Sequence, residues 1–138
     1  MNETNEALLN FFKALSDANR LKLVGLLAEN EATVEELAAL LDISASTVSH
    51  HLSKLAEIGL VSARAEGYYS IYRLETDALQ DMAKRLLQEE TLPDVAKDLD
   101  RKAYDRKVLT DYLREDGTIE KLPTNRRKLD VILRYITE

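Results

Sequence analysis

Two short helices with clear start signals follow one another between residues 33 and 59, and their spacing restricts the fold more than any other feature. Thr33 and Glu36 have the spacing of a capping box, in which each side chain accepts a hydrogen bond from the backbone N–H of the other residue. Ser44 can cap a second helix, and Gly59 can end it in the left-handed conformation. Two capped helices joined by a tight turn predict a helix-turn-helix.

Apolar residues at helical spacing predict two helices before this pair and one after it. Asp17 can cap the second of them, and its Leu-rich sequence suits a helix packed from several sides. Residues 61–74 favour β-strands and contain a turn signal at Glu66-Gly67, so we expect one β-hairpin. The helix nearest the N-terminus has an apolar stripe of Leu8, Phe11, Phe12 and Leu15. The helix that follows the hairpin has one of Leu79, Met82, Leu86 and Leu87.

This order of elements predicts a mainly α (α+β) fold, a winged helix-turn-helix with one β-hairpin wing, followed by a helical C-terminal extension. Pro93 biases Leu92 away from helical geometry, and the sequence beyond it is more densely charged. We therefore place the winged helix-turn-helix with its flanking helices in residues 1–91 and a helical segment in residues 92–138. Because the last apolar stripe still continues at Glu138, we expect this segment to be an incomplete second domain.

A basic cluster occupies the expected start of the last helix. Thr124 can cap this helix, and Arg126, Arg127 and Lys128 fall in its first turns, where cations oppose the helix dipole. A solvated basic face is the favoured interpretation of the cluster, and service to an anion or a phosphate backbone is the alternative. The expected inward residues of this helix are Leu129, Ile132, Leu133 and Ile136.

The net charge of −6 argues, for the chain as a whole, against a protein that binds polyanions. The acids are concentrated outside the helix-turn-helix: residues 1–42 hold three Lys or Arg against eight Asp or Glu, while residues 43–74 hold three against two. Affinity for DNA depends on local phosphate contacts more than on the total charge. The distribution therefore predicts weak, salt-sensitive DNA binding and does not exclude it.

The helix expected from Ser44 has an unusual outward face. With Val48 pointing inward, small hydroxyl side chains and one imidazole cover the opposite side. Such groups let a helix approach base edges closely and bind them or phosphates, whereas a merely solvated face is commonly rich in Glu and Lys. The six polar residues of this face are Ser46, Thr47, Ser49, His50, Ser53 and Lys54.

Several segments within residues 14–74, taken together, resemble the ArsR-type family of bacterial transcriptional repressors. The resemblance implies a dimeric regulator that binds double-stranded DNA and is released by an effector, which it leaves unidentified. We expect it in the cytoplasm, because the chain has no Cys and its polar, acidic N-terminus does not resemble a signal segment. The matching segments are Ala14-Leu15-Ser16-Asp17, Arg20-Leu21, Glu36-Leu37-Ala38, Ser46-Thr47-Val48-Ser49-His50-His51-Leu52, Gly59-Leu60-Val61 and Tyr72-Arg73-Leu74.

The resemblance assigns operator reading to a recognition helix at residues 44–58 and contact with the flanking DNA backbone to a wing at residues 61–74. It also favours a homodimer in which the two apolar stripes, Leu8, Phe11, Phe12 and Leu15 with Leu79, Met82, Leu86 and Leu87, pack across a two-fold axis. The expected DNA-binding residues are Ser44, Ser46, Thr47, Ser49, His50, Ser53, Lys54, Arg64, Tyr68, Tyr69 and Arg73.

Three residues depart from the family pattern. Ala45 stands where the family often has Gln, and Ala65 and Tyr68 stand where it often has basic residues. These departures remove a bidentate base contact and phosphate ligands. A winged helix that serves as a protein-interaction module with little DNA affinity is therefore the alternative function.

Catalytic, metal and membrane functions find no support in the sequence. The chain has no Cys, residues 77–90 contain no His, and adjacent His50 and His51 diverge on a helix, so we expect no metal site and no cofactor. Ser49 and His50 diverge in the same way, which leaves no nucleophile–base pair, so we expect no enzyme. No apolar run reaches the ~20 residues of a membrane span.

Overall fold

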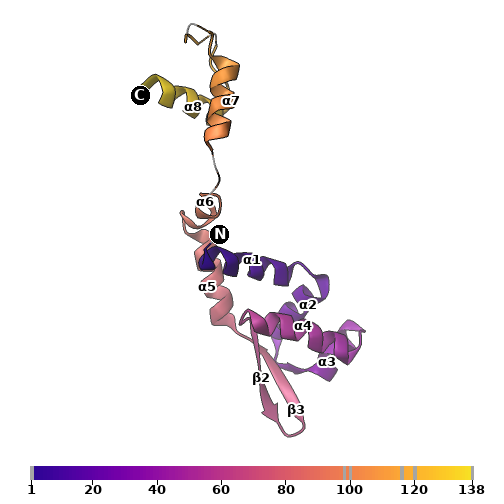
Figure 1. Cartoon of the computed structure of the whole chain (residues 1–138). Helices are drawn as coiled ribbons and strands as arrows, with labels where there is room; N and C mark the ends of the chain where they lie inside the picture. The colour runs from indigo at the N-terminus through magenta and orange to yellow at the C-terminus, as the bar shows by residue number, and fades with distance from the viewer. Residues whose placement is uncertain (1, 98, 100, 116, 120, 138) are drawn as a thin grey trace. The chain divides into compact units, whose positions relative to one another are not determined.

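The computed structural model of the chain describes residues 2–97, 99, 101–115, 117–119 and 121–137. The chain forms two compact units, Met1–Lys97 and Asp98–Glu138. The first unit contains α1 (Glu3–Leu15), α2 (Ala18–Glu29), β1 (Ala32–Thr33), α3 (Val34–Leu41), α4 (Ala45–Glu57), β2 (Val61–Glu66), β3 (Tyr69–Leu74), α5 (Thr76–Leu87) and α6 (Thr91–Val95) (Figure 1). This order confirms the predicted winged helix-turn-helix.

The predicted helix start signals are confirmed. The Asp17 side chain accepts from the backbone N–H of Arg20 at 3.1 Å and caps α2. Thr33 accepts from the N–H of Glu36 at 3.1 Å, and Glu36 accepts from the N–H of Thr33 at 3.4 Å, which completes the capping box of α3. Ser44 caps α4 by accepting from the N–H of Thr47 at 3.2 Å. Each cap supplies an acceptor to an N–H that has no partner inside its helix.

The turns on either side of α4 use left-handed residues. Asp42, with φ of 55°, ends α3, and the N–H of Ile43 returns to the carbonyl of Ala38 at 3.2 Å. After α4, Gly59 has φ of 78°, and the N–H of Leu60 donates to the carbonyl of Leu55 at 3.0 Å. These two turns confirm the predicted stop and fix both ends of α4.

Leucines and a valine from α2, α3 and α4 form the centre of the first core. Helix α2 contacts α1, α3, α4 and β3, as its Leu-rich sequence predicts. Burial of a side chain of this size contributes about 1.5–3 kcal/mol, so the core sets how the helix-turn-helix sits on α2. The fully buried members are Leu23, Leu37, Val48, Leu52 and Leu55, with Leu60 and Val61 beside them.

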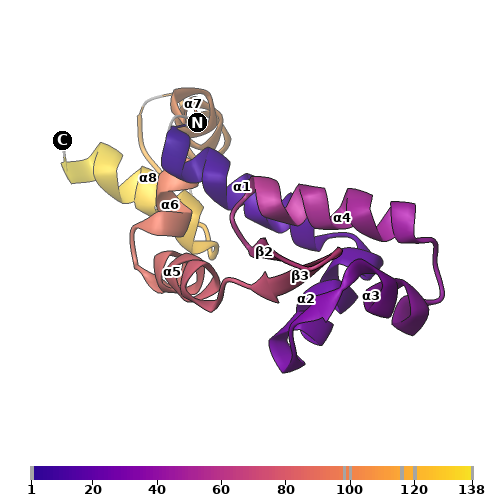
Figure 2. The ribbon, with the colours of Figure 1, turned by 90° about the horizontal axis from the view of Figure 1, so that it is seen from below.

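The sheet has three antiparallel strands in the order β1-β3-β2, and its β2–β3 hairpin runs from the start of α5 towards α2 and α3 (Figure 2). The expected hairpin is present, but its two-residue loop is Gly67-Tyr68, one position later than predicted, because Glu66 pairs with Tyr69. Gly67 has φ of 61°, the conformation needed at the first position of such a loop. The two-residue strand β1 was not predicted.

Ala14 joins Leu8 and Phe11 on the buried face of α1, and Phe12 is 48% exposed, so Phe12 lies at the surface of the unit. The expectation that Pro93 keeps Leu92 out of helical geometry is wrong. Pro93 lies in the first turn of α6, where its missing N–H costs no helical hydrogen bond. The division of the chain at residue 92 stays a prediction.

The second unit pairs α7 (Lys102–Tyr112) with α8 (Arg126–Thr137) around Val108, Val131 and Ile132. Asn125, not Thr124, caps α8 by accepting from the N–H of Lys128 at 3.2 Å. Of the expected inward stripe, Ile132 is fully buried, whereas Leu133 and Ile136 are exposed. In the described part of the chain, no helix is long and apolar enough to cross a membrane.

Leu37→Ala is expected to lower the free energy of unfolding by about 2–5 kcal/mol, because Leu37 is fully buried and its truncation leaves a cavity. Leu40→Ala is the matched control in the same helix, since Leu40 is 66% exposed and should change stability by no more than about 0.5 kcal/mol. Urea unfolding of the full chain, followed by circular dichroism, measures both. Equal losses in the two variants would contradict the assigned buried face of α3.

Candidate nucleic-acid interface

Helix α4 separates an apolar inner face from a polar outer face. Val48, His51, Leu52 and Leu55 are buried. All six side chains of the predicted outward face are exposed, namely Ser46, Thr47, Ser49, His50, Ser53 and Lys54. Ala45, at the start of the helix, is exposed as well. The outer face therefore offers hydroxyls, one imidazole and one ammonium group without a large side chain to hold the helix away from a surface.

The first turn of α4 is organised by Ser44. Besides its cap bond to the N–H of Thr47, its Oγ lies 2.7 Å from the Oγ1 of Thr47 and 3.2 Å from the Oγ of Ser46. These bonds fix three neighbouring hydroxyls relative to one another at the helix N-terminus, the end that favours anions. Ser44 thus has a structural role in addition to its predicted DNA contact.

His51 is the buried polar residue of the inner face, and Arg20 accounts for its position. Arg20 Nη1 lies 3.4 Å from His51 Nδ1. The same guanidinium donates from Nε to the carbonyl of Ala14 at 2.6 Å and from Nη2 to the carbonyl of Lys13 at 3.4 Å. Arg20 therefore ties the end of α1 to α4, and the neighbouring His50 is left on the exposed side.

A cationic pocket of about 400 Å³ lies beside α4. Lys13, Arg20 and Lys54 line it, together with Glu57, whose Oε1 is 3.9 Å from Lys54 Nζ. Of these cations, only Lys54 is predicted from the sequence as a DNA contact, because Lys13 and Arg20 belong to α1 and α2 and only the fold brings them to the pocket. In the sequence, Arg20 is visible only as part of the family resemblance.

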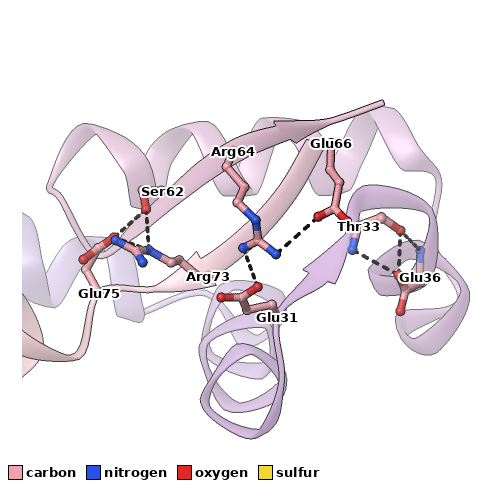
Figure 3. Close-up of polar contacts among 8 residues, drawn as sticks. All are labelled: Glu31, Thr33, Glu36, Ser62, Arg64, Glu66, Arg73 and Glu75. Atoms are coloured by element: carbon pink, nitrogen blue, oxygen red, sulfur yellow. Dashed lines mark hydrogen bonds and ion pairs between the residues drawn. The ribbon is translucent and has the colours of Figure 1, made fainter. Parts of the chain in front are cut away.

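Arg64 does not project freely from the wing (Figure 3). Its Nη1 forms an ion pair with Glu31, and its Nη2 lies 3.4 Å from Glu66 Oε2. The hydrogen bond with Glu31 is the main cause of the raised pKa of Arg64. The predicted phosphate ligand is thus held in an ordered position while two carboxylates offset its charge.

Arg73 is likewise paired, at the base of the wing (Figure 3). Its Nε lies 3.0 Å from Glu75 Oε1 and 3.3 Å from Ser62 Oγ, and the Ser62 hydroxyl donates to the same carboxylate oxygen. The bonds from Ser62 and then from Arg73 lower the pKa of Glu75. At the tip of the wing, by contrast, Tyr68 and Tyr69 are exposed, so its outermost side chains are phenolic.

The residues predicted for dimerisation divide into three groups. Leu8 and Phe11 are buried inside the unit. Phe12 and Leu87 are exposed, Leu87 by 85%. The other four, Leu15, Leu79, Met82 and Leu86, are half-buried. Part of each stripe is thus used by the subunit's own core, and part remains at its surface.

Within the described ranges, charged side chains outside α4 and the wing do not form a metal-binding group. Among the residues that the structure describes, no cluster of three or more His, Asp or Glu side chains has the geometry to hold a metal ion. Asp94 illustrates how carboxylates are used instead: it pairs with Lys97 at 2.8 Å and accepts from Asn5 at 3.3 Å. Both bonds lower the pKa of Asp94, and the bond with Lys97 is the larger cause. The bond with Asn5 joins α6 to α1.

The sequence pattern described as "Bacterial regulatory protein, arsR family" matches residues 17–63. The chain is 39% identical over 83 residues to the cadmium resistance transcriptional regulatory protein CadC of Listeria innocua, covering 57% of this chain and 70% of CadC. It is 36% identical over 78 residues to the transcriptional repressor SdpR of Bacillus subtilis, covering 56% and 87%. It is 35% identical over 77 residues to the transcriptional activator HlyU of Vibrio cholerae, covering 54% and 71%.

A solved structure is also similar to this chain. It is the homodimeric winged helix-turn-helix DNA-binding domain of Mb0332 from Mycobacterium bovis, a possible ArsR-family transcriptional regulator. The TM-score is 0.52 at 32% sequence identity, over 59% of this chain and 77% of that one. The family pattern runs from the cap of α2 into β2, and the sequence and structure comparisons each cover more than half of this chain.

Proposed function

The chain belongs to the arsR family of bacterial regulatory proteins, and from that premise we propose that it reads operator DNA as a homodimer through α4. Membership makes it a DNA-binding transcriptional regulator, in a family of non-enzymes. It also favours DNA over the alternative of a protein-interaction module. The observation that carries the proposal is the exposed outer face of α4, with four hydroxyls, one imidazole and one ammonium group above a fully buried inner face.

The short side chains on the outer face of α4 read the bases. Ser46, Thr47, Ser49, His50 and Ser53 can reach base edges when α4 lies in the major groove, and Lys54 is suited to a phosphate. Ala45 adds no hydrogen bond, so each half-site makes few strong contacts. Weak affinity per half-site, with a modest salt dependence, follows from this composition.

The wing contacts the backbone by exchanging ion-pair partners. Arg64 leaves Glu31 and Glu66 for a phosphate, while Tyr68 and Tyr69 donate phenolic hydrogen bonds from the tip. Arg73 is the second wing cation available for such an exchange. Exposed ion pairs contribute little to stability, so the exchange is inexpensive, but it reduces the net gain from each contact. Lys13 joins Lys54 as a further phosphate ligand in the pocket beside α4.

Dimerisation uses the surface parts of the two apolar stripes. Phe12 and Leu87 are exposed, and Leu15, Leu79, Met82 and Leu86 are half-buried, so a second copy can cover them across a two-fold axis. The homodimeric Mb0332 domain supports this arrangement. A two-fold dimer presents its recognition helices about 34 Å apart, the length of one DNA turn.

We place the action of the dimer in the cytoplasm, where bacterial DNA lies, and we assign it repression. SdpR is named a repressor and HlyU an activator, so family membership alone is compatible with either repression or activation of transcription. Repression requires only that the dimer occupies its operator. Activation requires an additional surface that recruits the transcription machinery, and the residues assigned above serve DNA and the dimer.

The double variant Ser46→Ala/His50→Ala is expected to bind an operator, selected from a random library by the wild type, about 10- to 100-fold more weakly, because base contacts are lost. Affinity for a random duplex should change far less, and α4 itself should remain stable because Ala is the better helix former. Fluorescence anisotropy measures both affinities. Gln80→Ala, on the exposed side of α5, is the control. Unchanged discrimination between the two duplexes would contradict base reading by α4.

Glu31→Gln is expected to strengthen binding to a random duplex several-fold and to make the fall of log affinity with log salt steeper by up to about 1, because Arg64 then has only Glu66 to leave. Glu29→Gln makes the same charge change at an exposed position outside the ion pair and is the matched control. Anisotropy titrations at several salt concentrations compare them. If both variants gain equally, the effect is one of net charge, and Arg64 does not exchange partners.

Phe12→Glu is expected to convert the dimer to a monomer and to weaken operator binding by about 100-fold, since the second half-site is no longer held by the first. Leu87→Glu, at a more exposed position, should act in the same way. Leu40→Glu places the same charge on α3, outside the stripes, and should remain dimeric. Sedimentation equilibrium at micromolar concentration gives the masses. A wild type that is monomeric, or a Phe12→Glu variant that is dimeric, would refute the assigned interface.

A further inference from the structure

A cleft of about 720 Å³ in the second unit is lined by four arginines, and we propose that it binds phosphate groups. The charged lining is Arg101, Arg126, Arg127 and Arg134 with one carboxylate, Asp130. Leu133 and Thr137 complete it. All these residues belong to one compact unit, so the site does not depend on where the winged helix-turn-helix lies. It is also separate from the proposed DNA reading by α4.

The fold changes the basic cluster that the sequence suggests. Lys128 lies over the ring of Tyr112, with its Nζ 5.8 Å from the ring centroid. Arg101, which precedes α7, and Arg134, two turns further along α8, join Arg126 and Arg127 in its place. The cations of the cleft are therefore all guanidinium groups. Their planar forks form paired hydrogen bonds with phosphate, which an ammonium group cannot match.

Ion pairs already orient two of these guanidinium groups. Arg126 Nε lies 3.4 Å from Asp130 Oδ1, and Arg134 Nη2 lies 3.4 Å from Asp105 Oδ1. Each of these two guanidinium groups has five N–H donors, so most remain for a ligand. Arg126, Arg127 and Arg134 less Asp105 and Asp130 leave a net charge of +1 before Arg101 is counted. This charge complements that of a bound phosphate group, which is about −1.5 to −2 at neutral pH.

The position of Arg126 and Arg127 has a structural cost. Both lie in the first turn of α8, where the helix dipole disfavours cations. Asn125 already caps this helix, so the arginines do not substitute for a missing cap. The apolar core of the unit consists of Val108, Val131 and Ile132 with a few partly buried neighbours, so the unit has little stability to offset unfavourable charge. An anion seated in the cleft relieves this repulsion.

Isothermal titration calorimetry of the full chain with inorganic pyrophosphate, at fixed ionic strength, tests the site. Arg126→Gln/Arg127→Gln should bind about tenfold more weakly or worse, as expected when charged hydrogen bonds are lost. Arg106→Gln/Lys107→Gln removes two exposed cations of α7 that do not line the cleft and should bind like the wild type. The cleft variant should melt at the same or a higher temperature than the wild type, because it removes charges that oppose the dipole. Arg134→Gln is a second cleft variant at the other end of α8.

A salt series with a random duplex identifies the source of the phosphate. If DNA fills the cleft, the slope of log affinity against log salt falls by about 1–2 in the cleft variant but not in the α7 control. If a phosphorylated small molecule fills it, the two variants bind DNA alike while pyrophosphate binding is lost only in the cleft variant. The proposal is overturned if the wild type does not bind pyrophosphate, or if the cleft and α7 variants bind it equally.

Discussion

The orientation of α4 depends on the burial of one of its faces against α2 and α3. Val48, Leu52 and Leu55 are fully buried, and they fix the rotation of the helix about its own axis. Rotating α4 by a single residue, about 100°, would expose these leucines and bury hydroxyls. Arg20 adds directional bonds to this apolar contact, because one guanidinium holds the end of α1 and the buried His51 together. The outer face is thus defined by what the inner face must bury.

Local signals in the sequence predicted most of the first unit. Caps at Asp17, Thr33 and Ser44 and the stop at Gly59 depend on residues within four positions, so their chemistry is visible without the fold. The strand β1 was missed because it has two residues and exists only through pairing with β3, some 40 residues away. Four apolar residues at helical spacing on α1 do not indicate which of them the core of the unit buries, so the exposure of Phe12 became visible only in the fold.

The candidate DNA contacts on α4 were predictable because, like the helix itself, they follow from the local sequence. Helical periodicity alone puts Ser46, His50 and Ser53 opposite Val48. The state of the wing was not predictable, because the partner of Arg64 is Glu31, on the far side of the helix-turn-helix in sequence. Only part of the arginine cleft was predictable, because Arg126 and Arg127 are adjacent in the sequence. The fold was needed to show that Arg134 and Arg101 line the cleft and that Lys128 lies over Tyr112 instead.

Charge is divided unevenly between the two units, and this division connects the two proposals. Residues 1–97 carry 9 Lys or Arg against 16 Asp or Glu, a net of −7, whereas residues 98–138 carry 10 against 9, a net of +1. In the first unit, the cations Arg64 and Arg73 are paired with carboxylates, so its attraction to a polyanion is weak and its contacts favour selectivity through hydroxyls. A phosphate site in the second unit then has one of two consequences. If it holds DNA backbone, it supplies the electrostatic affinity that the reading unit lacks, and if it holds a phosphorylated small molecule, it is where this regulator receives its signal.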